Sequence, residues 1–344
     1  MRKMASIRKI QQINKIENAD KICIYIVDGW QIVDEVNKYK INDFVVMLEI
    51  DSWVPTALAP FLSKGKVPRQ FNGVDGEKLK TVKLRGALSQ GLLLPVSVLP
   101  ADYAYHEGAD CSEILGVQKY EVPDNVTQGG KSVSNWPSIV PKTDQERLQN
   151  LKSVFDTKIK GQPFEITEKL DGSSATYYID AEGVYHVMSR NVDLARDENN
   201  LWWKMSAKYD IENKMKLCYE NEDFRKTFDK GFAIRGEIVG PGVNGNKLQL
   251  TEHTFHVFDL WEPVNGYCPP DIRHFMVADF NLTHVPLHEH FMVFNGTFEQ
   301  LLESANGQSV LNPNVKREGL VFKSINGDFT FKIVSNEWLL EFKE

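Results

Sequence analysis

The sequence has little cysteine, no long apolar run and no excess of positive charge. Only four cysteines (Cys23, Cys111, Cys218 and Cys268) occur in 344 residues, and none forms a C-x-x-C pair, so the sequence indicates neither a zinc site nor a disulfide framework. No apolar run approaches the ~18 residues that a membrane-spanning helix needs, and residues 1–15 lack the apolar centre of a signal peptide. We therefore expect an intracellular protein, cytoplasmic or nuclear, that does not associate with membranes.

The charge balance excludes one simple kind of function. The chain has 40 lysine and arginine residues against 47 aspartate and glutamate residues, a formal net charge of -7. Non-specific binding to nucleic acid depends mainly on phosphate neutralisation, so this balance argues against a protein that simply coats nucleic acid. A local basic groove remains compatible with it, because a site that holds phosphates beside divalent cations also needs carboxylates. The length allows two domains with sizeable cores.

Residues 1–120 are predicted to form an all-β domain. Short runs of apolar and β-branched residues alternate with turn signals such as Asp28-Gly29, a pattern typical of a small barrel. The expected strands are Ile22–Val27, Trp30–Val33, Phe44–Ile50, Lys80–Gly86 and Gln90–Pro95. We interpret the domain as similar to an oligonucleotide-binding (OB) barrel.

One expected strand of this domain is basic. Lys78 and Lys80 would share one face, and Lys83 and Arg85 the other unless a bulge shifts the register. Charge alone favours an ordinary solvated strand. In an OB barrel the same residues could follow a phosphate backbone along a groove, so Lys80, Lys83 and Arg85 are candidate nucleic-acid contacts.

A change of composition marks a domain boundary. Residues 121–135 are rich in Gly, Ser, Asn and Thr and are predicted to be a linker, followed by a second domain over residues 136–344. A helix is expected near its start, with Thr143 as N-cap and Glu146 as its capping-box partner. Helical spacing also covers residues 199–228 and 297–305, and strands fill the rest. Within the first of these stretches, Trp202, Trp203, Met205 and Tyr209 are expected in the core rather than as base-stacking platforms.

The most informative stretch of this second domain is EITEKLDGSSATYYID, residues 165–180. It predicts a strand, an abrupt turn at Leu170-Asp171-Gly172 and a second strand, so Lys169 is held at a strand–turn junction. Such a position suits a lysine that must reach a ligand at close range, because the glycine lets the backbone bend without a Cβ clash. A hairpin with a solvated lysine would give the same short pattern.

Five further segments follow this one in a fixed order. They are Ser189-Arg190-Asn191, AIRGEIVG (residues 233–240), FHVFDL (255–260), REGLVFK (317–323) and FKIV (331–334). Together with Lys169-x-Asp171-Gly172 they resemble motifs I, Ia, III, IIIa, IV and V of the covalent nucleotidyltransferases, which include polynucleotide ligases and mRNA capping enzymes. In those enzymes the motif I lysine attacks a nucleotide α-phosphate and carries the nucleoside monophosphate.

The order of domains narrows the resemblance. DNA ligases and capping enzymes carry an OB domain after motif V, whereas Lys332 lies twelve residues before the end of this sequence and the all-β domain comes first. That order, with KLRGALSQGLLLP and WPSIVPKTDQERLQN, resembles the ATP-dependent RNA ligases with an N-terminal OB domain. The resemblance implies an α+β protein: an N-terminal all-β barrel followed by a nucleotidyltransferase domain of antiparallel sheets with flanking helices.

The resemblance also implies a reaction and its substrates. A monomeric enzyme of this kind would use ATP with Mg²⁺ or Mn²⁺ and would seal 3′-OH/5′-phosphate nicks in RNA or an RNA-containing duplex, as in RNA repair. Lys169 would take AMP from ATP, AMP would pass to the RNA 5′-phosphate, and the 3′-OH would displace AMP.

Residue roles follow only by this resemblance. Lys169 would be the nucleophile, and Lys323 and Lys332 would neutralise the α-phosphate. Glu318, with Glu237, would hold the metal, in part through its waters, which suits Mg²⁺ because it sheds water reluctantly. The other implied nucleotide contacts are Glu168 beside the nucleophile, Glu237 on the ribose, Phe258 on the base, and Arg190 near the sugar and the RNA end. Taken singly, the glutamates could be surface residues and Phe258 a core residue.

The proposed nucleophile raises an electrostatic question. A free lysine has a pKa near ~10.4, so a nearby cation and partial burial would have to lower the pKa of Lys169 for attack at neutral pH. Many related ligases have a second motif V lysine at the position of Val334, so that cation must come from elsewhere or from Lys323.

Two other classes of protein stay open. An RNA-binding protein without catalysis would have lost the nucleophile or the metal carboxylates, but Lys169, Glu237, Glu318 and Lys332 are all present. Another polynucleotide ligase, acting on DNA or dependent on NAD, is the second alternative. An NAD-dependent enzyme would need an additional N-terminal element, and we find no likeness to one.

Overall fold

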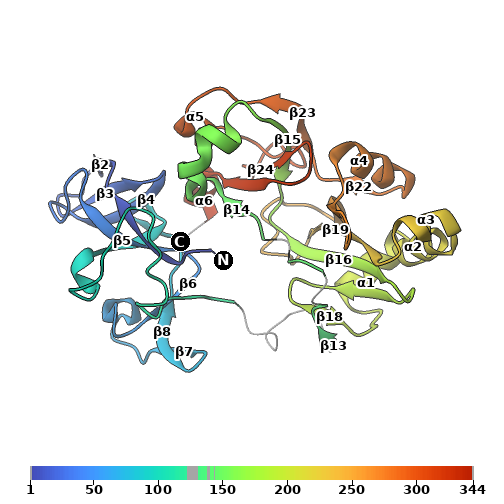
Figure 1. The fold of residues 1–344 in the computed structure, drawn as a ribbon, viewed down its shortest axis with the longest axis horizontal. Helices are drawn as coiled ribbons and strands as arrows, with labels where there is room; N and C mark the ends of the chain where they lie inside the picture. The colour runs from blue at the N-terminus through green and yellow to red at the C-terminus, as the bar shows by residue number, and fades with distance from the viewer. Residues whose placement is uncertain (1, 122–130, 138–139, 143, 343–344) are drawn as a thin grey trace. The chain divides into compact units, whose positions relative to one another are not determined.

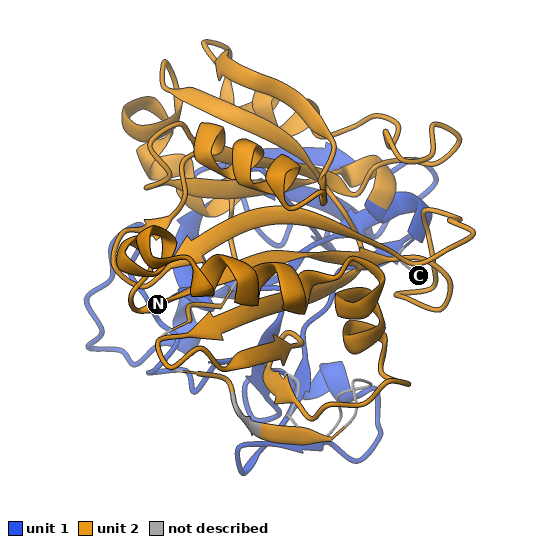
Figure 2. Cartoon of the chain, turned by 90° about the vertical axis from the view of Figure 1, so that its right-hand side faces the viewer, with its two compact units in different colours: residues 1–122, 339–344 blue, residues 123–338 orange. Residues whose placement is uncertain are grey.

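The computed structural model describes residues 2–121, 131–137, 140–142 and 144–342. The chain forms two compact units, residues 1–122 with 339–344 and residues 123–338 (Figures 1 and 2). The last six residues thus group with the first unit, whereas the sequence placed them in the second domain. Most of the predicted linker, residues 121–135, lies outside the described residues, but its end forms strand β13 (Ser132–Asn135).

Strands are the main regular secondary structure of the first unit, which confirms the predicted all-β region. Its sheets are β1-β5-β11 (Ala5–Lys9, Phe44–Glu49, Gly91–Pro95), β2-β3-β4 (Gln12–Lys15, Ile22–Val27, Trp30–Glu35), β12-β6-β8-β7 (Gln118–Lys119, Ser52–Pro55, Val74–Lys78, Arg69–Phe71) and β9-β10 (Val82–Leu84, Ala87–Ser89). Two short 3₁₀ helices, η1 (Pro60–Ser63) and η2 (Val96–Val98), connect strands. Asp28 and Gly29 have positive φ angles of 50° and 81°, which produces the tight turn between β3 and β4.

The continuous apolar run of β5 has a direct structural cause. Val46 and Leu48 pack into one apolar core, while Val45 and Met47 pack into a second core on the other face of the strand. Because successive side chains of a strand point to opposite faces, a strand buried on both sides cannot alternate apolar with polar residues.

The second unit contains two mainly antiparallel sheets. One has the order β13-β18-β17-β16-β19-β20-β21, with β22 beside β20 (β18 Val192–Leu194, β17 Tyr185–Met188, β16 Ser173–Asp180, β19 Gly231–Val239, β20 Thr254–Glu262, β21 Gly266–Tyr267, β22 Thr283–His284). The other has the order β14-β25-β24-β15-β23 (Glu146–Arg147, Thr330–Val334, Gly319–Ser324, Pro163–Lys169, Leu287–Val293). Among the described strands, β14–β25 and β20–β22 are parallel pairs.

Helices flank these sheets, as the resemblance implied. They are η4 (Leu148–Val154), a π-helical turn η5 (Phe155–Ile159), α1 (Leu201–Lys208), α2 (Ile211–Glu220), α3 (Glu222–Thr227), α4 (Pro270–Asp279), α5 (Phe298–Glu303) and α6 (Asn336–Phe342). Helices α1 and α2 pack on one face of the larger sheet (Figure 1), where Trp202, Trp203 and Met205 are buried and Tyr209 packs against them. Their predicted place in the core is confirmed.

The helix predicted near residue 143 begins later than expected. Thr143 lies outside the described residues, and Glu146 with Arg147 forms the extended strand β14, so the helix begins only at Leu148. The short helix expected at 297–305 is present as α5, where Thr297 and Gln300 form a capping box. In the part of the chain that the structure describes, no helix is long and apolar enough to cross a membrane.

Candidate active site

Strand register brings three lysines to one face of the five-stranded sheet. On β15 and β24, Lys169 lies opposite Gly319, and Val321 lies opposite Lys332 on β25. Because side chains alternate along each strand, Lys169, Lys332 and Lys323 share a face. The opposite face packs into an apolar core through Phe164, Ile166, Leu320, Phe322 and Phe331.

Lys169 forms an ion pair with Glu318. The distance from Nζ to Oε2 is 2.6 Å, and the side chains are 22% and 12% exposed. Burial disfavours the charged amine, but the charge of Glu318 and its hydrogen bond outweigh that effect and raise the pKa of Lys169. The expectation of a lowered pKa therefore has the wrong direction for this structure, since a carboxylate occupies the place where the sequence argument assumed cations.

Glu237 approaches the same turn from β19. Its Oε1 accepts a hydrogen bond from Gly172 N at 3.1 Å. A Cβ on Gly172 would lie 2.3 Å from the carbonyl oxygen of Ile238, so only glycine lets the turn after Lys169 pack this closely on β19. Burial, with the negative charges of Glu318 and Asp171, raises the pKa of Glu237 to about 8 despite the opposing charge of Lys169.

Lys332 lies among cations. Burial, together with the charges of Lys169 and Arg147, lowers the pKa of Lys332 to about 7. Arg147 is the register partner of Lys332 in the parallel pair β14–β25. The sequence reasoning did not single out Arg147, although it lies in WPSIVPKTDQERLQN, one of the segments that carried the family resemblance.

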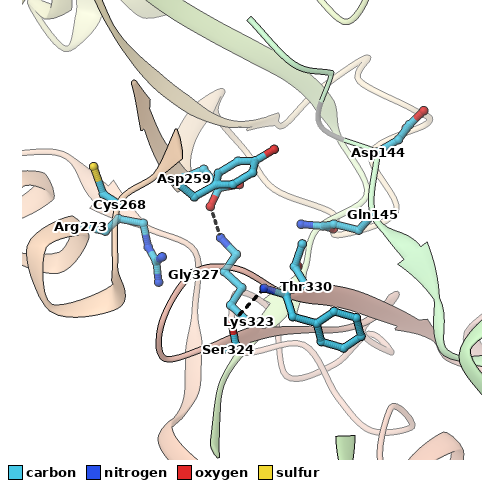
Figure 3. A pocket seen from close by; sticks show the side chains of 11 residues that line it. Asp144, Gln145, Asp259, Cys268, Arg273, Lys323, Ser324, Gly327 and Thr330 are labelled. Carbon is cyan, nitrogen blue, oxygen red and sulfur yellow. Dashed lines mark hydrogen bonds and ion pairs between the residues drawn. The ribbon is translucent and has the colours of Figure 1, made fainter. Parts of the chain in front are cut away.

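The side chain of Lys323 reaches Asp259 on β20 of the larger sheet (Figure 3). Its Nζ is 2.5 Å from Asp259 Oδ1 and also donates to the carbonyl oxygen of Phe258. Burial lowers the pKa of Lys323 to about 8 even though Asp259 opposes this shift. The pocket around it is lined by Asp144, Gln145, Asp259, Tyr267, Cys268, Arg273, Lys323, Ser324, Gly327, Phe329 and Thr330.

Comparisons with known proteins identify the family of the chain. A family model described as RNA ligase matches residues 162–334, and one described as an OB-fold domain matches residues 4–96. Solved structures of a Naegleria gruberi RNA ligase match nearly the whole chain. A Lys-to-Met mutant with AMP and Mn has 37% identity and a TM-score of 0.82, covering 99% of this chain and 98% of that one. The chain belongs to the RNA ligase family.

Two more structures of the Naegleria enzyme show the same degree of similarity. The form with PPi is 36% identical with a TM-score of 0.81 and covers 99% of both chains. A Lys-to-Ala mutant with ATP and Mn has the same identity and TM-score and covers 98% of both. A comparison with curated protein sequences gives no match.

Three further residues of this RNA ligase that are expected to bind nucleotide make contacts within the protein, and their roles stay predictions. Phe258 is partly buried and packs on an apolar cluster that includes Leu170. Glu168 points to the opposite face from Lys169, where it is buried and accepts hydrogen bonds from Ser309 Oγ at 2.5 Å and Val310 N at 2.8 Å. Arg190 is exposed and pairs with Asp144 at 2.8 Å.

The basic segment of the ligase is not one continuous strand. Arg85 and Gly86 have φ angles of 49° and 83° and form the turn between β9 and β10, so Lys83 and Arg85 do not share a strand face. Lys80 is exposed between β8 and β9, and Lys83 donates to the carbonyl oxygen of Leu340 at 3.3 Å. The assignment of Lys80, Lys83 and Arg85 to nucleic acid stays a prediction.

A partly buried network near Lys323 has ligand types that also suit metals. Side-chain atoms of Glu165, His274 and His284 lie within 4.8 Å of one another. However, Arg273 donates to Glu165 and, at 3.1 Å, to Nε2 of His284. The guanidinium is a permanent cation that already uses both groups, so the network fits a structural support better than a metal site.

Proposed function

We propose that this RNA ligase uses ATP to seal 3′-OH/5′-phosphate nicks in RNA or an RNA-containing duplex, with Lys169 as the covalent carrier of AMP. The observation that carries the proposal is the group around Lys169: Glu318 at 2.6 Å, Glu237 at the following turn, and Lys332 on the same sheet face. A nucleophilic amine, carboxylates for a cation and a further lysine for phosphate are the parts that nucleotidyl transfer requires.

The Naegleria structures support these assignments. Two of its mutants change a lysine and an aspartate that lie two positions apart. Two other mutants change a glutamate and a lysine that lie fourteen positions apart. These are the separations of Lys169 from Asp171 and of Glu318 from Lys332 in this chain. Of those four, the Lys-to-Met mutant and the mutant of the glutamate have AMP and Mn, and the mutant of the second lysine has ATP and Mn.

The carboxylates fit a divalent cation. Burial, with the negative charges of Glu318 and Asp171, raises the pKa of Glu237 to about 8. Positive charge placed among them would relieve that repulsion. Bound there through carboxylates and waters, Mg²⁺ or Mn²⁺ would neutralise negative charge on the reacting phosphates.

Residues of the chain have separate roles in the three steps of the reaction. Lys169 loses a proton and its Nζ attacks the α-phosphorus of ATP, forming an N–P bond while the bond to pyrophosphate breaks. Lys332, as ammonium, stabilises charge on the α-phosphate in the transition state. The RNA 5′-phosphate next displaces Lys169 from AMP, forming a phosphoanhydride. Attack by the 3′-OH on the RNA phosphate forms the phosphodiester and releases AMP.

The first test separates adenylation from sealing. Wild type incubated with α-labelled ATP and Mg²⁺ should carry label through denaturing electrophoresis, and Lys169→Met should carry none. Lys160→Met, an exposed lysine of the same unit, is the matched control and should label normally. Labelling of Lys169→Met would show that another residue is the nucleophile.

A second test concerns the nick. Lys169→Met should still seal a nicked RNA duplex whose 5′ end is already adenylylated, because the last step does not need the lysine nucleophile. Wild type should join the nicked duplex with ATP faster than it joins the same strands unpaired. Equal rates on both substrates would contradict the preference for nicks.

A further inference from the structure

The segment between β19 and β20, residues 240–253, has no role in the reaction described above. Asn244, Asn246 and Gln249 have left-handed φ angles of 44°, 47° and 54°. The side chain of Asn246 donates to the carbonyl oxygen of Leu250 at 2.9 Å and accepts from its N–H at 3.0 Å. Asparagine adopts this conformation comparatively readily, whereas Gln249 needs support from surrounding contacts, and the hydrogen bonds of Asn246 help to define the conformation of the loop.

The loop forms an ion pair and a hydrogen bond with the turn that follows Lys169. Lys247 Nζ is 2.5 Å from Asp171 Oδ2, and Asn244 Nδ2 is 2.6 Å from the carbonyl oxygen of Gly172. Both charged side chains are partly buried, at 22% and 16% exposure, so the ion pair is screened less than one on the surface. Gly172 N also donates to Glu237, so both the N–H and the carbonyl group of Gly172 are hydrogen-bonded to side chains.

The position of Lys247 is itself supported. Its Nζ lies 4.7 Å from the centre of the Trp338 ring, a cation–π contact that restricts the lysine side chain. The ammonium is thus directed at Asp171 rather than free in solvent. Without the Lys247 ammonium, the Asp171 carboxylate would be a second negative charge acting on Lys169, which already forms an ion pair with Glu318.

We propose that Lys247, together with Asn244, is a positioning residue for adenylation: it holds Asp171 and the turn 170–172 so that Lys169 is directed at the α-phosphate. The inference rests on the proposed function, since it concerns the attack of Lys169 on ATP. Lys247 acts through Asp171 and need not contact the nucleotide. A misplacement of about 1 Å at a nucleophile can cost ~10²-fold in rate, so the chemical step should be sensitive to this contact.

The experiment measures self-adenylation in single-turnover reactions over a range of ATP concentrations. Lys247→Met should lower the rate constant at saturating ATP by about 10- to 100-fold, while the ATP concentration at half-maximal rate changes by less than about threefold. Lys247→Arg should restore most of the rate, because it keeps a cation at Asp171. Lys216→Met is the matched control: Lys216 also forms a lysine–carboxylate pair, with Glu212 at 2.8 Å, but within α2, and its loss should not change the rate.

A double-mutant cycle distinguishes positioning from general support of the fold. In an Asp171→Asn background, Lys247→Met should add less than about threefold, because both changes remove the same pair. Independent, multiplicative losses would overturn the proposal, as would a wild-type rate for Lys247→Met. Thermal melting checks folding of each variant, and Asn244→Ala provides a second test if Lys247→Met unfolds. A wild type that never labels itself would contradict the proposed function and this inference together, whereas a labelled wild type with an unaffected Lys247→Met contradicts the inference alone.

Discussion

Replacing Lys332 with methionine should stabilise the protein while removing activity, and the gain should depend on pH. Lys332 is a partly buried amine beside the cations Lys169 and Arg147, and its pKa falls from the ordinary 10.5 to about 7. The folded state therefore disfavours the charged form. A lysine in such a position is kept for a reason other than stability, which on the proposed function is the charge it places near the α-phosphate.

The sign and size of this stability change follow from proton linkage. Because the folded pKa lies below the unfolded one, the unfavourable contribution is complete below about pH 7 and disappears as the pH rises above about 10.5. The shift corresponds to roughly 5 kcal/mol at most, of which about 2 kcal/mol remains at pH 9. Lys332→Met should therefore increase the free energy of unfolding by about 3 kcal/mol more at pH 6 than at pH 9.

Scanning calorimetry follows the unfolding transition of each variant. The transition is recorded for wild type, Lys332→Met and the exposed control Lys160→Met at pH 6, 7.5 and 9. Self-adenylation by Lys332→Met should meanwhile fall by about 100-fold, by analogy with the loss of one stabilising donor at a transition state. A gain in stability that is the same at pH 6 and pH 9, or a loss at pH 6, would refute the assignment of Lys332 as a buried amine with a lowered pKa.

Three other predictions test neighbouring parts of the site. Glu318→Ala should slow adenylation at least about 100-fold, because it removes charge beside Lys169 and the cation. The control Glu299→Ala removes an exposed partner of Lys152 and should not slow adenylation. Equal rates of the two mutants at saturating Mg²⁺ would remove Glu318 from the site. Stabilisation by Mn²⁺, measured as a shift in melting temperature, should grow between pH 6.5 and pH 8.5, because below about pH 8 the cation must displace the proton of Glu237; a flat profile would contradict this. A fragment of residues 123–344 should keep part of its self-adenylation but bind and seal nicked RNA much more weakly and with a shallower salt dependence, and sealing at the full-length rate would show that the N-terminal unit does not serve RNA.

The sequence predicted the strands of the site better than their side-chain partners. The turn after Lys169 and the strands of motifs III, IV and V could be located because glycine and β-branched runs signal them locally. The pair between Lys169 and Glu318 joins residues 149 positions apart, and no local pattern specifies it. The basic segment was misjudged for a related reason: Arg85 takes a left-handed conformation that a strand pattern does not indicate, so one expected strand became the hairpin β9–β10.

The direction of the pKa of Lys169 shows most clearly what the sequence could not supply. Motif matching identifies which ionisable groups belong to the site, but a pKa depends on which of them is nearest. Here Glu318 is nearest to Lys169, so that lysine holds its proton, while Glu237 is buried among carboxylates and tends to remain protonated. On the proposed function, a cation that draws Glu318 and Glu237 toward itself would reverse both effects at once: it would free the amine from its ion pair and favour the charged carboxylate. On the same proposal, the reactivity of Lys169 would depend on the presence of the metal, and Glu237 on β19 and Glu318 directly before β24 would both be needed to hold it.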